Sequence, residues 1–195
     1  MIKALIFDID GVLTSTKKLH ENAFIRAVNE FGFDVTKQTH KELLDGLPTR
    51  VKLDKLAVPE NVRNEVFNLK QKYTFEEVKN HNLFSQSVYD IFQHFKCLKL
   101  GICSNAIRPF CNLIMEKLKV KVECISNDDA KPKPDPDMYI KMMEILDVLP
   151  NETLIFEDSV FGLESGYRSG GNVVVIENPR HLTINKIEQY IGVYK

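Results

Sequence analysis

Short apolar runs alternate along the chain with longer stretches whose apolar positions repeat every three or four residues. The runs predict buried strands at residues 3–7, 99–103, 122–125, 153–156 and 172–176. The stretches that flank the third run have the apolar stripes of helices that cover a sheet. Because strands that alternate with helices form parallel sheets, this pattern predicts an α/β fold with a parallel sheet.

The stretch over residues 15–82 breaks this alternation, because it has helical periods and no strand pattern. One apolar stripe runs over residues 23–31 and another over residues 62–73. We expect residues 15–82 to form a small inserted helical cap domain, and residues 1–14 with 83–195 to form the α/β core. An insertion after the first strand lies at the ligand edge of an open sheet, so its expected role is a lid; a purely structural helical layer also fits.

Length and charge limit the classes of function. A chain of 195 residues fits one principal core with a modest insertion. Its 26 basic and 27 acidic residues leave a net charge of −1, which gives no field to attract nucleic acid or an anionic membrane. No apolar run reaches the roughly 18 residues of a membrane span. The four cysteines lack the spacing of a zinc site, so we expect free thiols and a cytoplasmic location.

Two acidic pairs stand at the predicted ends of strands. Asp8 and Asp10 follow the first strand and precede Gly11, and Glu157 and Asp158 follow the fourth. If those strand ends are neighbours, up to four carboxylates gather around one point. Such crowding is unfavourable unless a cation neutralises it, and carboxylates with water suit Mg²⁺. A single Asp in this position is usually a turn or a helix cap, but the paired arrangement favours a metal site.

Two further segments indicate phosphate chemistry. Ser104 and Asn105 follow the second strand at the start of a helix, where such residues cap the helix or bind an anion. Residues 131–136 alternate with proline, which stiffens the segment and places Asp135 to cap a helix that begins at Pro136. A lysine of this segment can bind a phosphoryl oxygen or keep a carboxylate ionised, and a rigid basic surface loop fits equally well.

Taken in order, these segments resemble the four motifs of the haloacid dehalogenase superfamily. The matching residues are Asp8-Ile9-Asp10-Gly11-Val12, Ser104-Asn105, Lys131-Pro132-Lys133-Pro134-Asp135 and Glu157-Asp158-Ser159 with Gly162 and Gly166. The resemblance spans nearly the whole chain and implies a Rossmann-like parallel sheet core. The helical insertion is similar to the small cap of the subfamily that contains beta-phosphoglucomutase and phosphoglycolate phosphatase. Thr14, Thr16, His20 and the segment 46–50 are also similar to that group.

The resemblance implies a role for each acidic residue. Asp8 would attack the substrate phosphorus and form an aspartyl-phosphate. Asp10 would protonate the leaving oxygen and then deprotonate the attacking water. Mg²⁺ would be held by the Asp8 carboxylate, the Asp10 backbone carbonyl and Asp158, with Glu157 either a ligand or a neighbour of the ligands.

The resemblance also implies phosphate-binding residues. Ser104 and Lys131 would hold the phosphoryl oxygens, with Asn105 in support. Lys131 is preferred to Lys133 because the lysine of the family directly precedes the first proline, and Lys133 is then expected to be exposed. His20 and Arg50 are candidate contacts from the cap domain.

The function that this resemblance implies is Mg²⁺-dependent hydrolysis of a small phosphorylated metabolite. Retention of Asp10, which dehalogenases do not need, favours phosphoryl transfer over carbon–halogen cleavage. Two alternatives stay open: a phosphosugar mutase, and a binding protein that keeps the fold without turnover. The mutase has a substrate-binding lysine near the end of its cap helices, and segment 73–77 offers no counterpart. A monomer suffices because the site needs no second chain, although a dimer is compatible with it.

Overall fold

The chain divides into two compact units. The computed structural model describes residues 1–44 and 47–193. One unit comprises Met1–Ser15 with Leu83–Lys195, and the other comprises Thr16–Asn82. The second unit begins one residue later than the predicted helical insertion of residues 15–82, and its role as a cap domain stays a prediction.

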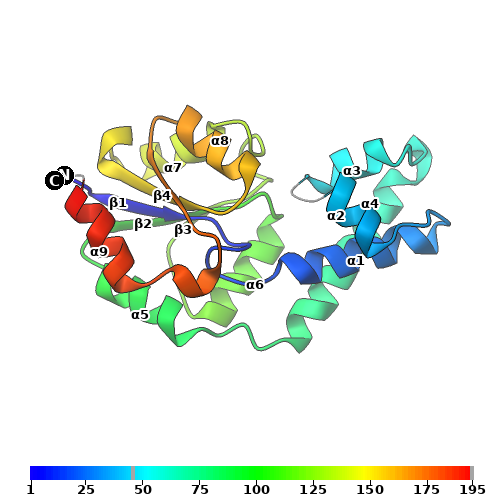
Figure 1. Ribbon diagram of the computed structural model, residues 1–195, viewed down its shortest axis with the longest axis horizontal. Coiled ribbons are helices and arrows are strands. Elements are labelled where there is room, and N and C mark those ends of the chain that lie inside the picture. The colour runs from blue at the N-terminus through cyan, green and yellow to red at the C-terminus, as the bar shows by residue number, and fades with distance from the viewer. Residues whose placement is uncertain (45–46, 194–195) are drawn as a thin grey trace. The chain divides into compact units, whose positions relative to one another are not determined.

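The first unit contains one five-stranded sheet in which all neighbouring strands are parallel (Figure 1). Its order is β3-β2-β1-β4-β5. The strands are β1 (Ala4–Phe7), β2 (Lys99–Cys103), β3 (Glu123–Ile125), β4 (Thr153–Glu157) and β5 (Asn172–Val175). Every predicted strand is present, and each end differs from its predicted position by at most one residue. The predicted α/β fold with a parallel sheet is confirmed.

Helices cover both faces of this sheet. They are α5 (Gln86–His94), α6 (Arg108–Leu118), α7 (Asp137–Ile145), α8 (Val160–Arg168) and α9 (Ile184–Val193), with short 3₁₀ turns at Pro150–Glu152 and Pro179–His181. Helices α7 and α8 lie on one face, and α5, α6 and α9 lie on the other (Figure 1). Since both faces are covered, the central strands are buried on both sides, which explains why their sequences are continuously apolar.

The two faces of β1 pack against different helices. Ala4 and Ile6 join a buried cluster with Met138 and Met142 of α7. On the opposite face, the Phe7 ring lies 5.2 Å from the ring of Phe92 in α5, centroid to centroid. This packing fixes β1 between two helical layers, so the residue after Phe7 is delivered to the carboxyl end of the sheet.

The strands β2 and β3 are added on one side of β1, and β4 and β5 are added on the other side. Phe7 is in register with Ile102 of β2 on one side and with Phe156 of β4 on the other. In open parallel sheets, the carboxyl ends of the strands at such a switch point form the usual ligand-binding crevice. The register therefore brings the residues that follow Phe7 and Phe156 to that position.

In the part that the structure describes, the second unit consists of helices joined by turns and loops and contains no strand. Its helices are α1 (Lys17–Glu30), α2 (Lys37–Leu43), α3 (Thr49–Lys55) and α4 (Glu60–Asn80). Phe24 and Val28 of α1 pack in one apolar cluster with Val66 and Tyr73 of α4, as the two sequence stripes predict. Among the described residues of both units, no helix combines the length and apolar character that a membrane crossing needs.

Candidate active site

A tight loop after β1 carries Asp8 and Asp10. The backbone N–H of Asp8 donates to the Phe156 carbonyl at 3.0 Å, which continues the sheet ladder by one residue. The loop then turns at Gly11, whose φ of 101° lies in the region that favours glycine. Gly11 N donates to the Thr14 carbonyl at 2.7 Å and closes the turn. The turn leaves Asp10 close enough to Asp8 for its charge to raise the pKa of the Asp8 carboxyl.

Lys133 lies at the centre of the site. Its Nζ donates to Asp8 Oδ1 at 2.6 Å, to Glu157 Oε1 at 2.5 Å and to the Cys103 carbonyl at 2.8 Å. These bonds account for all the hydrogens of an ammonium group. Only 2% of Lys133 is exposed, so these interactions replace water almost completely. Burial alone would lower the Lys133 pKa, but the carboxylates of Asp8 and Glu157 outweigh burial and raise it, so the amine stays protonated.

The structure places Lys133, and not Lys131, against Asp8. The preference for Lys131 and the expectation that Lys133 is exposed are therefore both corrected. Lys131 is exposed, and its backbone N–H donates to Asp137 Oδ2 at 3.0 Å beyond the site. Both lysines directly precede a proline, so this sequence context does not distinguish them. The distinction comes from Asn105, whose Oδ1 accepts from Lys133 N at 2.8 Å and whose Nδ2 donates to the Lys133 carbonyl at 3.2 Å.

The proline-rich segment is also held from α8. Ser165 Oγ donates to the Asp135 carbonyl at 2.7 Å, and Arg168 Nη1 donates to the Pro134 carbonyl at 3.0 Å. Asp135 Oδ1 accepts from Asp137 N at 3.1 Å, at the first residue of α7 and one residue later than predicted. With Asn105 on one side and α8 on the other, the backbone of Lys133 is fixed before its side chain enters the site.

Ser104 is buried directly after β2. Its backbone N–H donates to the Ile125 carbonyl at 3.0 Å, and its hydroxyl oxygen accepts from Ala106 N at 3.1 Å. Because the hydroxyl accepts in that bond, it keeps a hydrogen that it can donate to an anion. The Asn105 amide instead forms hydrogen bonds with the backbone of Lys133. Asn105 thus supports a phosphate-binding segment, as the resemblance implies.

Glu157 is fully buried at the end of β4 and is surrounded by donors. Its Oε1 accepts from Lys133 and from Tyr139 Oη at 2.6 Å. Its Oε2 accepts from Asp158 N at 3.1 Å and from Ser159 Oγ at 3.4 Å. Both oxygens are thus engaged within the protein, which favours a positioning role for Glu157 between Lys133 and Tyr139. Burial raises the Tyr139 pKa well above its usual value, and the Glu157 charge adds to that effect.

An acidic cluster forms where β1 and β4 end. Asp8, Glu157 and Asp158 each offer a carboxylate oxygen, and these oxygens lie within 4.8 Å of one another. Burial raises the Asp8 pKa well above its ordinary value, Lys133 opposes this, and Glu157 adds to it. A hard divalent cation fits this donor set because oxygen ligands suit it and its charge would offset the repulsion. Asp158 is half-buried and better placed than Glu157 to be a direct ligand.

Gly162 gives a direct test of how closely Glu157 is packed. A Cβ added at Gly162 would lie 2.0 Å from Glu157 Oε2, so the Glu157 carboxylate would have to move. We expect Gly162→Ala to lower the free energy of unfolding by about 2–3 kcal/mol, measured by urea denaturation. Gly192→Ala is the matched control, since a Cβ at Gly192 meets nothing within 4 Å. Equal stability of the two variants would contradict this description of the Glu157 site.

The helical unit holds a buried lysine that was not among the candidate residues predicted from the sequence. Lys70 of α4 is only 6% exposed, and its Nζ lies 2.9 Å from His20 Nδ1 of α1. Lys70 lies about one helical turn before segment 73–77, which contains no lysine. Arg50 is exposed, donates to Asn64 Oδ1 at 3.3 Å and lies over the Phe67 ring. Gly46, in the predicted segment 46–50, lies outside the described residues.

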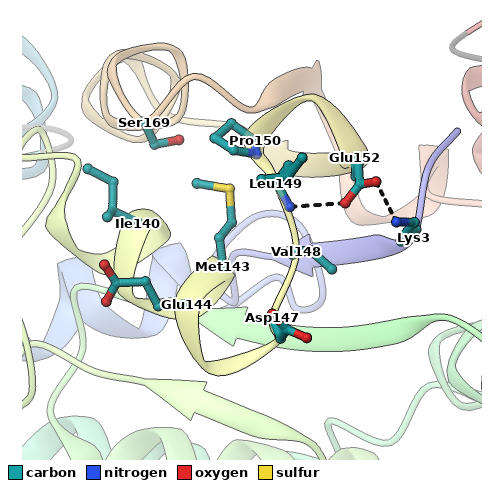
Figure 2. Close-up of a pocket in the computed structure, with 10 residues that line it drawn as sticks. All are labelled: Lys3, Ile140, Met143, Glu144, Asp147, Val148, Leu149, Pro150, Glu152 and Ser169. Carbon is teal, nitrogen blue, oxygen red and sulfur yellow. Dashed lines mark hydrogen bonds and ion pairs between the residues drawn. The ribbon is translucent and has the colours of Figure 1, made fainter.

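A separate hollow of about 450 Å³ lies near the amino end of the sheet (Figure 2). It is bordered by Met143, Leu149 and Pro150 and by the ion pair between Lys3 Nζ and Glu152 Oε1 at 2.5 Å. Lys3 precedes β1 and Glu152 precedes β4, whereas the acidic cluster follows these strands. None of the candidate site residues lines this hollow, so it is distinct from the acidic cluster.

The chain is similar in sequence to known proteins over most of its length. The sequence profile of the haloacid dehalogenase-like hydrolases matches residues 5–176. A protein of Thermotoga maritima named phosphorylated carbohydrates phosphatase is 28% identical over 180 residues, which cover 87% of this chain and 82% of that protein. Pyrophosphatase PpaX of Anoxybacillus flavithermus is 29% identical over 195 residues, covering 93% of this chain and 88% of that protein.

A solved structure shows the same fold. Beta-phosphoglucomutase of Clostridium difficile superposes with a TM-score of 0.83 at 19% identity, and the alignment covers 100% of this chain and 99% of that one. The family profile spans most of the chain, from β1 to the end of the sheet, and therefore includes Asp8, Lys133 and Asp158. This chain belongs to the haloacid dehalogenase-like hydrolase family.

Proposed function

We propose that this hydrolase is a phosphatase that releases phosphate from a small phosphorylated metabolite through a phosphoryl group carried on Asp8. The observation that supports this most is the contact of Lys133 with Asp8 Oδ1, in a buried cluster of carboxylates. The buried Lys133 ammonium favours the ionised, nucleophilic form of the Asp8 carboxylate and so opposes the effect of burial. The relatives whose names state phosphatase activity support the same reaction.

The first step transfers the phosphoryl group to the protein. The Asp8 carboxylate attacks phosphorus, the bond from phosphorus to the ester oxygen breaks, and Asp10 supplies the proton that the leaving oxygen takes up. Lys133 holds Asp8 Oδ1 and so orients the second carboxylate oxygen for attack. Ser104 donates its hydroxyl hydrogen to a phosphoryl oxygen, because its oxygen is already fixed by Ala106 N.

The second step regenerates Asp8. Asp10 removes a proton from water, the water oxygen attacks phosphorus, and the Asp8 oxygen leaves as a carboxylate. Lys133 again stabilises the charge that returns to Asp8. We propose that Asp8, Asp158 and the Asp10 carbonyl hold Mg²⁺, which when bound offsets the negative charge of the phosphoryl oxygens. All of these residues come from one chain, so we propose that a monomer suffices for catalysis.

Removal of divalent metal is expected to abolish phosphate release from a generic phosphate ester. Without the cation, the carboxylates of the acidic cluster and the negative phosphoryl group would repel one another. The measurement compares the rate before chelation, after chelation and after Mg²⁺ is restored. We expect a fall of at least about 100-fold and full recovery. A rate that survives complete chelation would exclude the metal from the proposal.

Phosphosugar mutase activity is the second candidate, and Lys70 is the observation that favours it. Buried Lys70, paired with part-buried His20, places a basic group in the helical unit, whereas segment 73–77 contains none. A mutase would pass the phosphoryl group to a sugar hydroxyl instead of water. Phosphorus NMR with a hexose phosphate distinguishes the two reactions, since a phosphatase yields free phosphate and a mutase yields an isomer.

Lys70→Met is expected to separate binding from chemistry in either reaction. In this proposal Lys133 acts in the chemical step, and Lys70, which belongs to the helical unit, acts only in substrate binding. Loss of Lys70 should therefore raise the KM for the preferred substrate about 10-fold. The phosphate release from a minimal aromatic ester should stay within about twofold, because that ester offers little beyond the phosphoryl group. Lys72→Met on the same helix is the control. Equal losses with both substrates would assign Lys70 to stability instead.

A further inference from the structure

Two of the four cysteines form a pair that the proposed phosphatase chemistry does not use. Cys111 is buried in α6, and Cys124 is partly exposed in β3, in register with Ile102. Their thiols are hydrogen bonded to each other. The other two cysteines lie elsewhere: Cys103 is buried in β2 and Cys97 is exposed before it.

The surroundings make the two thiols unequal. The hydrogen bond from Cys111 lowers the Cys124 pKa, burial opposes this, and the guanidinium of Arg108 lowers it further. The same hydrogen bond, together with burial, raises the Cys111 pKa. Arg108 is the first residue of α6 and is itself paired with Asp129 Oδ2, which fixes its guanidinium near Cys124. Cys124 thus has the features of a reactive thiolate, and Cys111 is a protonated thiol held against it.

We propose that Cys124 and Cys111 form an oxidation site at which a hydroperoxide converts the pair to a disulfide. The Cys124 thiolate attacks one peroxide oxygen, the O–O bond breaks, and the departing oxygen takes up a proton. This oxidises Cys124 to a sulfenic acid. The Cys111 sulfur then attacks the Cys124 sulfur, the S–O bond breaks, and hydroxide leaves with the Cys111 proton as water. With hydrogen peroxide, the two thiols lose two electrons and two hydrogens, and the peroxide becomes two waters.

Both cysteines lie next to backbone groups that hold the loop carrying Ser104. Cys111 Sγ lies 3.9 Å from the Ala106 carbonyl, and Asn127 N donates to that same carbonyl at 3.0 Å. Ser104 N donates to the Ile125 carbonyl, next to Cys124. A disulfide would join α6 to β3 across this network. A second expectation rests on the proposed function: the disulfide should displace the loop that carries Ser104 and so slow phosphate release.

The test treats the full chain with hydrogen peroxide and maps its cysteines by mass spectrometry after digestion. We expect a Cys111–Cys124 disulfide within one chain, reversed by dithiothreitol. Cys97→Ser, the matched control, should behave in the same way. Cys111→Ala should stop at a Cys124 sulfenic acid that dimedone traps, and Arg108→Gln should slow the reaction at Cys124 several-fold. Circular dichroism checks that each variant is folded, and the Arg108 variant tests the site with both thiols in place.

Oxidation of Cys97 before Cys124, or only disulfides between chains, would overturn the proposal. Phosphate release before and after oxidation tests the link to the loop: we expect a several-fold fall in the parent chain and none in Cys124→Ser. An unchanged rate with the disulfide formed would overturn that link. If the reduced chain releases phosphate from no ester, the proposed function fails, while the disulfide map still decides the oxidation site.

Discussion

Asp8→Asn is expected to lower phosphate release by about 10⁴-fold or more, because an amide cannot replace the carboxylate that attacks phosphorus. Asparagine keeps the shape of the side chain and still accepts a hydrogen bond from Lys133. Glu157 remains as the charged partner of Lys133 in the variant. The fold should therefore survive, and circular dichroism with steady-state kinetics on a generic ester measures both properties.

Asp34→Asn provides the matched control for this substitution. Asp34 is exposed in the helical unit and contacts none of the candidate site residues named above. The activity of the Asp34→Asn variant should therefore equal that of the parent chain. The kinetic constant to compare is kcat, since substrate binding uses other groups. If Asp8→Asn keeps more than about a tenth of the parent kcat, Asp8 is not the nucleophile and another group carries the reaction.

Lys133→Met should abolish activity and destabilise the fold at the same time. Methionine has nearly the same length, but it leaves the Asp8 and Glu157 carboxylates buried without their shared cation. Loss of one partner from a buried ion pair costs about 3–5 kcal/mol in the free energy of unfolding. Urea denaturation measures this cost, and phosphate release from a generic ester measures the lost orientation of Asp8.

Lys131→Met separates the roles of the two lysines. Lys131 is exposed, so its replacement should leave both the unfolding midpoint and the rate of phosphate release unchanged. Lys131→Met and Lys133→Met make the same chemical change at positions two residues apart. An inactive Lys131→Met beside an active Lys133→Met would reverse the assignment and restore the sequence-based preference.

The strands and the acidic cluster could be predicted because each depends on local sequence. A strand buried on both faces is continuously apolar, as β1 and β4 are, and the residue after such a strand must lie at the carboxyl edge of the sheet. The positions of Asp8 and Asp158 follow from that rule alone. Their mutual proximity needed only the further assumption that β1 and β4 are neighbours, which the strand order satisfies.

The lysines could not be assigned from sequence because their positions depend on contacts between distant segments. Lys131 and Lys133 share the same proline context, and the choice between them is made by Asn105, which lies more than twenty residues earlier. Tyr139 fits an apolar helical stripe, yet its hydroxyl also donates to Glu157. Lys70 meets His20 from another helix, so no local pattern marks it.

The most direct test of the proposed chemistry is to trap the phosphoryl group on the protein. The chain is mixed with excess phosphate ester and Mg²⁺, quenched in acid within one turnover, reduced with borohydride and mapped by mass spectrometry. An aspartyl-phosphate is an acyl phosphate, which borohydride reduces to homoserine at the modified residue. We predict homoserine at residue 8 in the parent chain and none in Asp8→Asn. Complete turnover with residue 8 unmodified at every quench time, or with the phosphoryl group on another residue, would contradict the account.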